Sequence, residues 1–448
     1  MLLQNPTQRI ALIVIAFGLL FGFGITSIAG VLDQLTTLFN LDTSGQETLV
    51  SVLVAACFFG ALLAGPLSAR LGRHPAMILA ATLALLGYVV IALQPSFHLL
   101  IGARVVIGLS IGLSSMVVPL YAAESTAATH RGAVVSLFQL AITAGILCAY
   151  TSALLLGSRW NGFDLMALGL VPALLAAGTL FTLPESPRWL QTHKTEAEAA
   201  GTALRLGLQD EWVSIEVQDA QPVATDAMPK KLPAPRIVAV LALCSGLFVL
   251  QNFSGIDGIL YYAPHIFQTL GFAPGLAALA ATFGLGVVNF LATIVAMRIV
   301  DGAGRRPLMI WGSAFMVAGL ALVLVAMHWN WPWVSLFGLS LFILAFAVSL
   351  GPLPYVMMSE LFPRHIRERG IAAAASTSWL FNALIAYTFL SATQAFGLQI
   401  IIAFFALVCL ASLVISLRYL PETRGARLED IETDVMQGCR LRELGKRP

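Results

Sequence analysis

Charged residues are scarce in this chain. Only 11% of its 448 residues are Asp, Glu, Lys or Arg, and 58% are hydrophobic, whereas a soluble protein usually carries about 25% charged residues. The formal net charge of +2 is too small to favour a nucleic acid as partner. The composition indicates a protein that crosses the lipid bilayer many times.

Closely spaced metal ligands and phosphate-binding loops are also lacking. The five cysteines are scattered, four of them within apolar runs, and the seven histidines form no cluster. No glycine-rich loop of the phosphate-binding type is present. We therefore expect no metal, no cofactor and no enzymatic activity.

Twelve apolar runs are long enough to cross a bilayer, which takes about 20 residues for each span. Backbone polar groups in lipid must be paired within each segment, and the alternating pattern of a membrane barrel is absent, so the expected fold is an all-α membrane protein. The runs fall near 10–32, 48–69, 75–94, 98–121, 132–157, 163–183, 237–263, 272–299, 306–328, 332–358, 369–394 and 397–420.

Lysine and arginine are distributed unevenly between the two sides of the predicted spans. Of the 25 such residues, Arg104 lies deep inside a span and Arg159 in an odd-numbered loop, while the other 23 fall in the termini, in the even-numbered loops or within three residues of the span ends that border them. The positive-inside rule then predicts that both termini are cytoplasmic. We expect a multi-pass protein of the cell inner membrane or plasma membrane.

The two halves of the chain repeat each other. Three matching pairs recur at nearly one offset: Gly72 and Gly304 at 232 residues, Glu124 and Glu360 at 236, and Glu185 and Glu422 at 237. A repeat of this kind predicts two six-helix bundles with the same orientation, the major facilitator fold.

The expected domain boundaries follow the spans. The six-helix bundles cover residues 1–183 and 237–420. A polar stretch at 184–236 forms a cytoplasmic linker with short helices, because KTEAEAAGTALRLGL has an amphipathic helical pattern. Residues 421–448 are expected to form a cytoplasmic tail.

The motifs GRHP, PESPRWL, QNFSGID, DGAGRRP, SELFP and PETRG occur along the chain in this order. Together they resemble the sugar porter family of the major facilitator superfamily, and the resemblance covers nearly the whole chain. It implies a monomeric transporter of a monosaccharide, a hexose or pentose, that works by alternating access with its substrate between the two bundles.

The resemblance also implies a sugar site made of polar side chains within the spans. Sugar hydroxyls donate and accept hydrogen bonds, which suits amides together with aromatic faces. Tyr355 and Ser378 stand where the family usually has tryptophan and glutamine, so the particular sugar stays open. The implied substrate-binding residues are Gln139, Gln251, Asn252, Asp257, Asn289, Tyr355, Trp379 and Asn382.

Two further expectations concern these spans. Amides in spans also bond neighbouring helices, so each amide has a purely structural alternative. Gly255 and Gly258 are expected to loosen the seventh span, as in a gating segment.

Charged residues at the cytoplasmic ends of the spans are expected to form a gate. In the family such groups join the two halves in one conformation and separate in the other. As surface ion pairs, they would each contribute only ~0–1 kcal/mol; alternatively they only set the topology. The expected members are Arg73, Glu124, Arg131, Glu185, Asp301, Arg305, Arg306, Glu360, Arg367 and Glu422.

Proton coupling is the open question. Proton-coupled members of the family carry an acid in the first span, paired with an arginine in the fourth, but here the acid position is Gly24, while Arg104 is kept. A carboxylate inside a span is costly unless the protein receives it. Our hypothesis is that Asp257 replaces the lost acid, either as proton acceptor or as counter-ion to Arg104.

Three alternatives stay open. Asp257 would act only as an acceptor for a sugar hydroxyl, the chain would be a facilitative uniporter without proton coupling, or it would be a membrane sugar sensor that transports nothing. Only about 28 residues follow the last predicted span, which is short for the partner-binding tail of a sensor.

Overall fold

The computed structural model describes residues 5–209, 234–362, 367–426, 428–437 and 439–444. Within these ranges the regular structure is helical, without a strand. Twelve of the described helical segments are long and apolar enough to cross a membrane. Both the predicted number of spans and the all-α membrane fold are thereby confirmed.

The chain divides into two compact units. The first unit comprises Met1–Phe39 and Val52–Lys230, and the second comprises Asn40–Ser51 and Lys231–Pro448. The second span begins at Thr43, so its first residues belong to the second unit.

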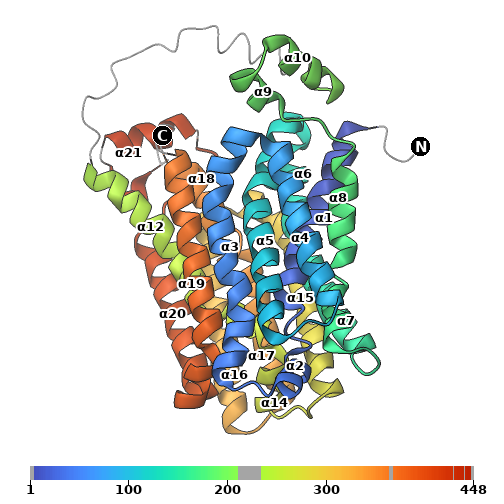
Figure 1. Ribbon diagram of the computed structural model, residues 1–448. Coiled ribbons are helices and arrows are strands. Elements are labelled where there is room, and N and C mark those ends of the chain that lie inside the picture. The colour runs from blue at the N-terminus through green and yellow to red at the C-terminus, as the bar shows by residue number, and fades with distance from the viewer. Residues whose placement is uncertain (1–4, 210–233, 363–366, 427, 438, 445–448) are drawn as a thin grey trace. The chain divides into compact units, whose positions relative to one another are not determined.

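The helices of the first half are labelled in Figure 1. They are α1 (Pro6–Thr26), α2 (Leu32–Phe39), α3 (Thr43–Leu71), α4 (Arg73–Ala92), α5 (Phe97–Ser125), α6 (Ala128–Leu156), α7 (Gly162–Ala167), α8 (Leu170–Leu180), α9 (Pro187–His193) and α10 (Glu196–Arg205). The amphipathic pattern in the linker corresponds to α10, which buries Ala199, Thr202 and Ala203.

The second half repeats this arrangement of long helices. Its elements are α12 (Ala234–Phe253), α13 (Ile256–Tyr261), α14 (Ala263–Thr269), α15 (Leu276–Ala303), α16 (Arg305–His328), α17 (Pro332–Val348), α18 (Leu353–Leu361), α19 (Arg367–Phe396), α20 (Leu398–Arg418), α21 (Leu428–Met436) and the short 3₁₀ helix η1 (Leu441–Glu443).

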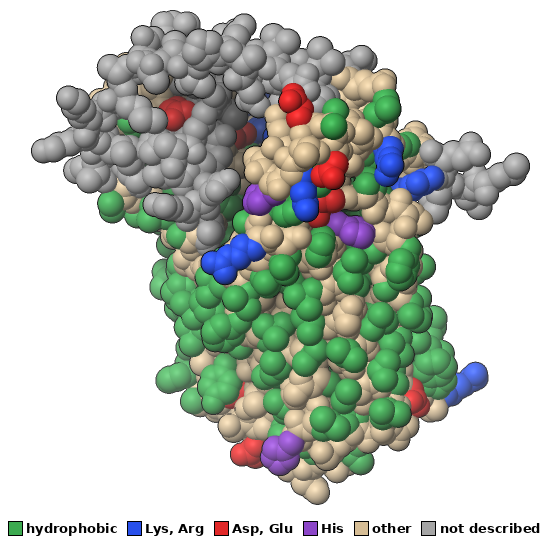
Figure 2. Space-filling model, turned by 45° about the horizontal axis from the view of Figure 1, so that its top comes forward, with side chains coloured by type: hydrophobic (Ala, Val, Ile, Leu, Met, Phe, Trp, Pro, Cys, Tyr) green, Lys and Arg blue, Asp and Glu red, His purple; other side chains and the backbone are tan. Residues whose placement is uncertain are grey.

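Exposed hydrophobic side chains cover the flanks of the helices (Figure 2). Leu86, Trp311, Phe337 and Leu407 are between 56% and 65% exposed. Side chains of this kind are favourable against lipid and unfavourable in water, so the surface agrees with a protein embedded in a bilayer.

The seventh span is broken near its middle. Helix α12 ends at Phe253, and α13 begins after Gly255, whose φ of +93° lies in the left-handed region. Glycine adopts this region without the steric cost of a Cβ. A Cβ at Gly255 would also lie 2.1 Å from the Phe405 ring. The expected loosening of this span is therefore a defined break at one glycine.

Candidate functional site

The break in the seventh span brings polar side chains into the second unit. Gln251 and Asn252 lie in the last turn of α12, and Asp257 lies in the first turn of α13. Helix α19 packs against both segments. Discontinuous helices of this kind supply substrate sites in transporters, because their ends present polar groups within the membrane.

The Gln251 side-chain amide has a hydrogen-bond partner for its nitrogen but none for its oxygen among the described residues. Its Nε2 donates a hydrogen bond to the carbonyl oxygen of Gly351 at 2.9 Å, which fixes the amide. Its buried Oε1 has no hydrogen-bond partner among the described residues. Leaving a buried acceptor unpaired costs about 1–3 kcal/mol, so a hydroxyl donor from a ligand would be received favourably at this atom.

The Asn252 side-chain amide donates hydrogen bonds to other groups of the protein. Its Nδ2 donates to the carbonyl of Phe248 at 2.7 Å and to Ser378 Oγ at 3.2 Å. The side chain is only 2% exposed. This geometry favours the helix-bonding role that an amide in a span commonly has.

Asp257 belongs to a cluster with Tyr261 and Asn382. The Tyr261 hydroxyl donates to Asn382 Oδ1 at 3.0 Å and lies 3.5 Å from Asp257 Oδ1. The Asn382 side chain therefore lies beside the Asp257 carboxylate, with Tyr261 in contact with both. Tyr261 is not among the residues predicted from the sequence, although its position four residues after Asp257 predicts the same helix face.

Tyr355 and Ser378, the two residues that depart from the family pattern, lie next to each other. Tyr355 in α18 is 47% exposed, and its ring packs edge-on against Phe248 with centroids 4.8 Å apart. Its hydroxyl lies beside Ser378, the same side chain that accepts the hydrogen bond from Asn252. Serine is smaller than the glutamine that the family usually has at position 378. Ser378 thus leaves room for the Tyr355 hydroxyl.

The remaining three predicted substrate-binding residues lie on helices α15, α19 and α6. Asn289 in α15 is 6% exposed, and Trp379 in α19 is half-buried. Gln139 lies on α6 in the first unit, where its side chain is exposed. Their part in substrate binding stays a prediction.

Neighbouring side chains occupy the space beside Gly24, the position where proton-coupled members of the family carry an acid. A Cβ at Gly24 would lie 2.7 Å from Ile111 Cδ1 and 3.0 Å from the Tyr88 hydroxyl. Arg104 in α5 is 1% exposed. Arg104 belongs to the first unit and Asp257 to the second, so the proposed ion pair between them also stays a prediction.

A buried acid in the second span, Glu47, lies outside the predicted set. Glu47 precedes the expected second span, but α3 already begins at Thr43, and Glu47 is only 3% exposed. Its Oε1 accepts a hydrogen bond from the Ser391 backbone N–H at 2.7 Å, and its Oε2 accepts from the Ser391 hydroxyl at 2.6 Å. Thr43 Oγ1 similarly donates to Gln394 Oε1 at 2.9 Å.

One charge cluster lies at the helix ends of the first unit. The Arg73 guanidinium donates from Nε and Nη2 to the two carboxylate oxygens of Glu124, at 2.9 and 2.8 Å. Glu185 accepts from the backbone N–H groups of Arg73 and His74 at 3.0 and 3.2 Å, so it caps the start of α4. Arg131 Nη2 donates to the Thr126 carbonyl at 3.4 Å.

The second unit repeats this cluster. Arg305 donates to Glu360 Oε1 from Nε and Nη2, at 3.3 and 3.0 Å. Glu422 accepts from the backbone N–H groups of Arg305 and Arg306, at 3.0 and 3.2 Å, and caps α16. The side chains of Asp301 and Arg367 lie outside the described residues.

The paired charges are more buried than the surface pairs we expected. The side chains of Arg73, Glu124, Arg305 and Glu360 are only 10–17% exposed. Removing one partner of such a pair leaves a poorly solvated charge, which costs more than breaking an exposed pair. Removal of one partner is therefore expected to cost more than the ~0–1 kcal/mol that an exposed pair contributes.

Two glycines hold these clusters in place. Gly72 and Gly304 precede α4 and α16 with φ values of +105° and +87°. A Cβ would lie 2.1 Å from Glu185 Oε2 at the first position and 2.7 Å from Glu422 Oε2 at the second. Glycine is required at both positions by the backbone conformation and by the approach of the capping carboxylate.

The described residues contain no group of three or more His, Cys, Asp or Glu that could hold a metal ion. The polar cluster around the α12 break and the two charge clusters are thus the chemical features that the helices position. The amides and hydroxyls around the α12 break suit a neutral polyhydroxylated ligand.

The comparisons with known proteins agree with this arrangement. The galactose-proton symporter of Escherichia coli K12 is 33% identical over 440 residues, which cover 96% of this chain and 94% of that protein. The glucose transporter of Staphylococcus epidermidis is 30% identical over 431 residues, covering 94% and 95%. The inward-open structure of the xylose transporter from E. coli superposes with a TM-score of 0.82 at 28% identity, covering 95% of this chain and 99% of that one.

The family model described as "Sugar (and other) transporter" matches residues 10–435. That range contains both charge clusters and the broken seventh span. The chain therefore belongs to the sugar transporter family of the major facilitator superfamily, and it is a membrane transporter and not an enzyme.

Proposed function

We propose that this protein carries a monosaccharide across a bacterial inner membrane by alternating access. The relatives named for galactose, glucose, arabinose and xylose transport support this substrate class. We further propose that the protein works as a monomer, with both termini in the cytoplasm as the positive-inside rule predicts.

The main support for the proposed sugar site is the hydrogen bonding of the Gln251 amide. Its Nε2 is anchored to Gly351, and its buried Oε1 has no partner among the described residues. A sugar hydroxyl would donate to this oxygen and remove the cost of the unpaired acceptor. Tyr261 and Asn382 would bind further hydroxyls, with the half-exposed Tyr355 ring against the C–H face of the sugar.

Asp257 is the group that we propose to bind the coupling proton. It lies inside the seventh span, and a carboxylate within a membrane is commonly a proton relay or an ion site. Tyr261, whose hydroxyl lies 3.5 Å from the carboxylate, and Asn382, which accepts from that hydroxyl, also belong to the proposed sugar site. Sugar binding would therefore change the hydrogen bonds of the carboxylate, which links the two cargoes physically.

The charge clusters would serve as the cytoplasmic gate. Each joins helix ends that are far apart in sequence, through Arg73 and Glu124 in one unit and Arg305 and Glu360 in the other. Alternating access requires packed elements with two discrete arrangements, and hydrogen-bonded charges at helix ends are groups that can exchange partners between them.

Counterflow of labelled sugar in liposomes tests transport itself. We expect labelled sugar outside to exchange with unlabelled sugar inside for at least one of a panel of hexoses and pentoses. The reason is that the binding site of a transporter opens alternately to the two sides of the membrane. A non-transporting sensor would bind sugar without exchange.

Uphill uptake in energised vesicles tests the proton role. Asp257→Asn should abolish accumulation but keep counterflow, because the amide still bonds sugar and cannot release a proton. Glu47→Gln is the matched control, since it neutralises another buried acid outside the polar cluster. Accumulation that persists in Asp257→Asn and still collapses with an uncoupler would rule out this role. Absence of accumulation in the unaltered protein would instead identify a facilitative uniporter.

A further inference from the structure

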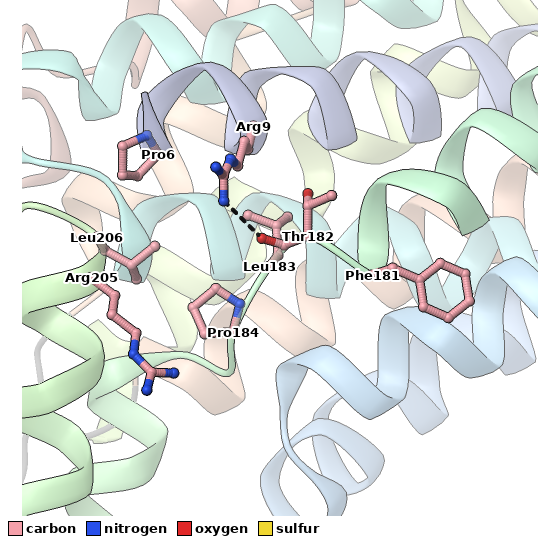
Figure 3. Close-up of a pocket in the computed structure, with 8 residues that line it drawn as sticks. All are labelled: Pro6, Arg9, Phe181, Thr182, Leu183, Pro184, Arg205 and Leu206. Atoms are coloured by element: carbon pink, nitrogen blue, oxygen red, sulfur yellow. Dashed lines mark hydrogen bonds between the residues drawn. The ribbon is translucent and has the colours of Figure 1, made fainter. Parts of the chain in front are cut away.

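A cavity of about 440 Å³ lies at the beginning of α1 in the first unit (Figure 3). None of its lining residues belongs to the polar cluster at the α12 break or to either charge cluster, although Pro184 directly precedes Glu185. Its walls come from the first turn of α1, the segment after α8 and the end of α10. The lining residues are Pro6, Arg9, Phe181, Thr182, Leu183, Pro184, Arg205 and Leu206.

Two arginines give this cavity a positive charge. Arg9 and Arg205 line it, and none of the eight lining residues carries a carboxylate. Arg9 Nη1 donates to the Thr182 carbonyl at 3.4 Å, which holds the guanidinium at the wall (Figure 3). Two like charges on one cavity favour an anion, and the planar guanidinium matches the oxygens of a phosphate.

The cavity also lies where two spans end. The first span begins at Pro6, and the sixth ends at Leu180. The next residue, Phe181, is 91% exposed, and it lies on the opposite side of the cavity from Arg205 (Figure 3). An aromatic ring exposed to this degree at the end of a span suits the bilayer interface, where its apolar face contacts lipid.

The volume and the mixed chemistry point to more than a bare anion. A cavity of about 440 Å³ lies in the range of ~300–1,000 Å³ found for small-molecule sites. Its charged part and the adjacent apolar ring match the two parts of a phospholipid. Basic pockets between spans on the cytoplasmic side are known to take lipid head groups.

We propose that this cavity binds the phosphate head group of an anionic phospholipid of the cytoplasmic leaflet. Arg9 and Arg205 hold the phosphate oxygens, and the acyl chain lies against Phe181. The bound lipid thereby joins α1, α8 and α10, the last of which belongs to the linker helices.

Native mass spectrometry of the full chain in detergent tests this site, with phosphatidylglycerol, phosphatidylcholine and inorganic phosphate as probes. We expect phosphatidylglycerol to bind more tightly than phosphatidylcholine. The double variant Arg9→Gln/Arg205→Gln should weaken phosphatidylglycerol about tenfold or more, because each arginine near a membrane surface contributes substantially to binding anionic lipid. The variant Arg9→Lys/Arg205→Lys should keep most of the binding.

Two further variants separate the possible outcomes. Arg418→Gln removes an exposed arginine at the end of the last span and should leave lipid binding unchanged. Phe181→Ser should weaken phosphatidylglycerol but not inorganic phosphate. The proposal is overturned if a properly folded double variant, judged by its unchanged elution and melting, binds phosphatidylglycerol as the unaltered protein does. It is also overturned if Phe181→Ser binds phosphatidylglycerol as tightly as the unaltered protein does and inorganic phosphate displaces the lipid from both, which would identify a site for a soluble anion.

Discussion

The Tyr88 side chain is enclosed by two glycines. A Cβ at Gly24 would lie 3.0 Å from its hydroxyl, and a Cβ at Gly169 would lie 2.2 Å from its ring. The hydroxyl is buried and has no hydrogen-bond partner among the described residues. The absence of an acid at Gly24 is thus accompanied by a bulky neighbour in the same space, which explains why the position accepts no side chain.

Replacing Tyr88 by phenylalanine should stabilise the protein. The change removes a buried hydroxyl that pairs with no described residue, and such groups cost about 1–3 kcal/mol. Thermal unfolding in detergent should show a higher melting temperature. Tyr121→Phe is the matched control, because the buried Tyr121 hydroxyl donates to the Pro184 carbonyl at 2.9 Å and its loss should lower the melting temperature. A lower melting temperature for Tyr88→Phe would show that the Tyr88 hydroxyl makes a hydrogen bond in the folded protein.

At the scale of single helices, the seventh span shows how sequence and structure relate. Its apolar length predicted a span, and QNFSGID predicted a polar stretch within it. The site of the break follows from the contact of Gly255 with Phe405, which lies on a helix remote in sequence. Tyr261 was predictable from its spacing to Asp257, but the bonds between Glu47 and Ser391, 344 residues apart, have no local signal.

Gly255→Ala should disrupt this break. A left-handed φ costs an L-residue about 1–2 kcal/mol, and the new Cβ would clash with Phe405. We expect a lower melting temperature and slower counterflow. Gly246→Ala is the control, since Gly246 lies within α12 with no atom within 4 Å of the added Cβ, and alanine is favoured in a helix. Equal behaviour of the two variants would contradict the requirement for glycine at 255.

Across the whole molecule, the duplication seen in the sequence is repeated in atomic detail. Each unit holds an arginine bound by one glutamate and a helix start capped by another, and each has a left-handed glycine beside the cap. The matched offsets of 232, 236 and 237 residues made this repeat predictable. The burial of the pairs was not predictable, because it depends on how neighbouring helices cover the ends.

Glu124→Gln and Glu360→Gln should destabilise the protein additively. Each change leaves a partly buried arginine without its charged partner, at a cost of about 3 kcal/mol. The residues belong to separate clusters with no shared partner, so the double variant should lose the sum. Chemical unfolding in mixed micelles measures these differences, with the exposed Glu198→Gln as control. A double variant much less or much more destabilised than the sum would reveal coupling between the clusters.

The complete charge cluster within each unit has a consequence for the origin of this protein. The hydrogen bonds described around Arg73 join residues of the first unit, and those described around Arg305 join residues of the second. An ancestral gene of half the length would already have encoded every one of these contacts. Such a gene product could have functioned as a pair of identical copies, and fusion of two genes would then have freed the halves to diverge, one of them acquiring the polar cluster around Asp257.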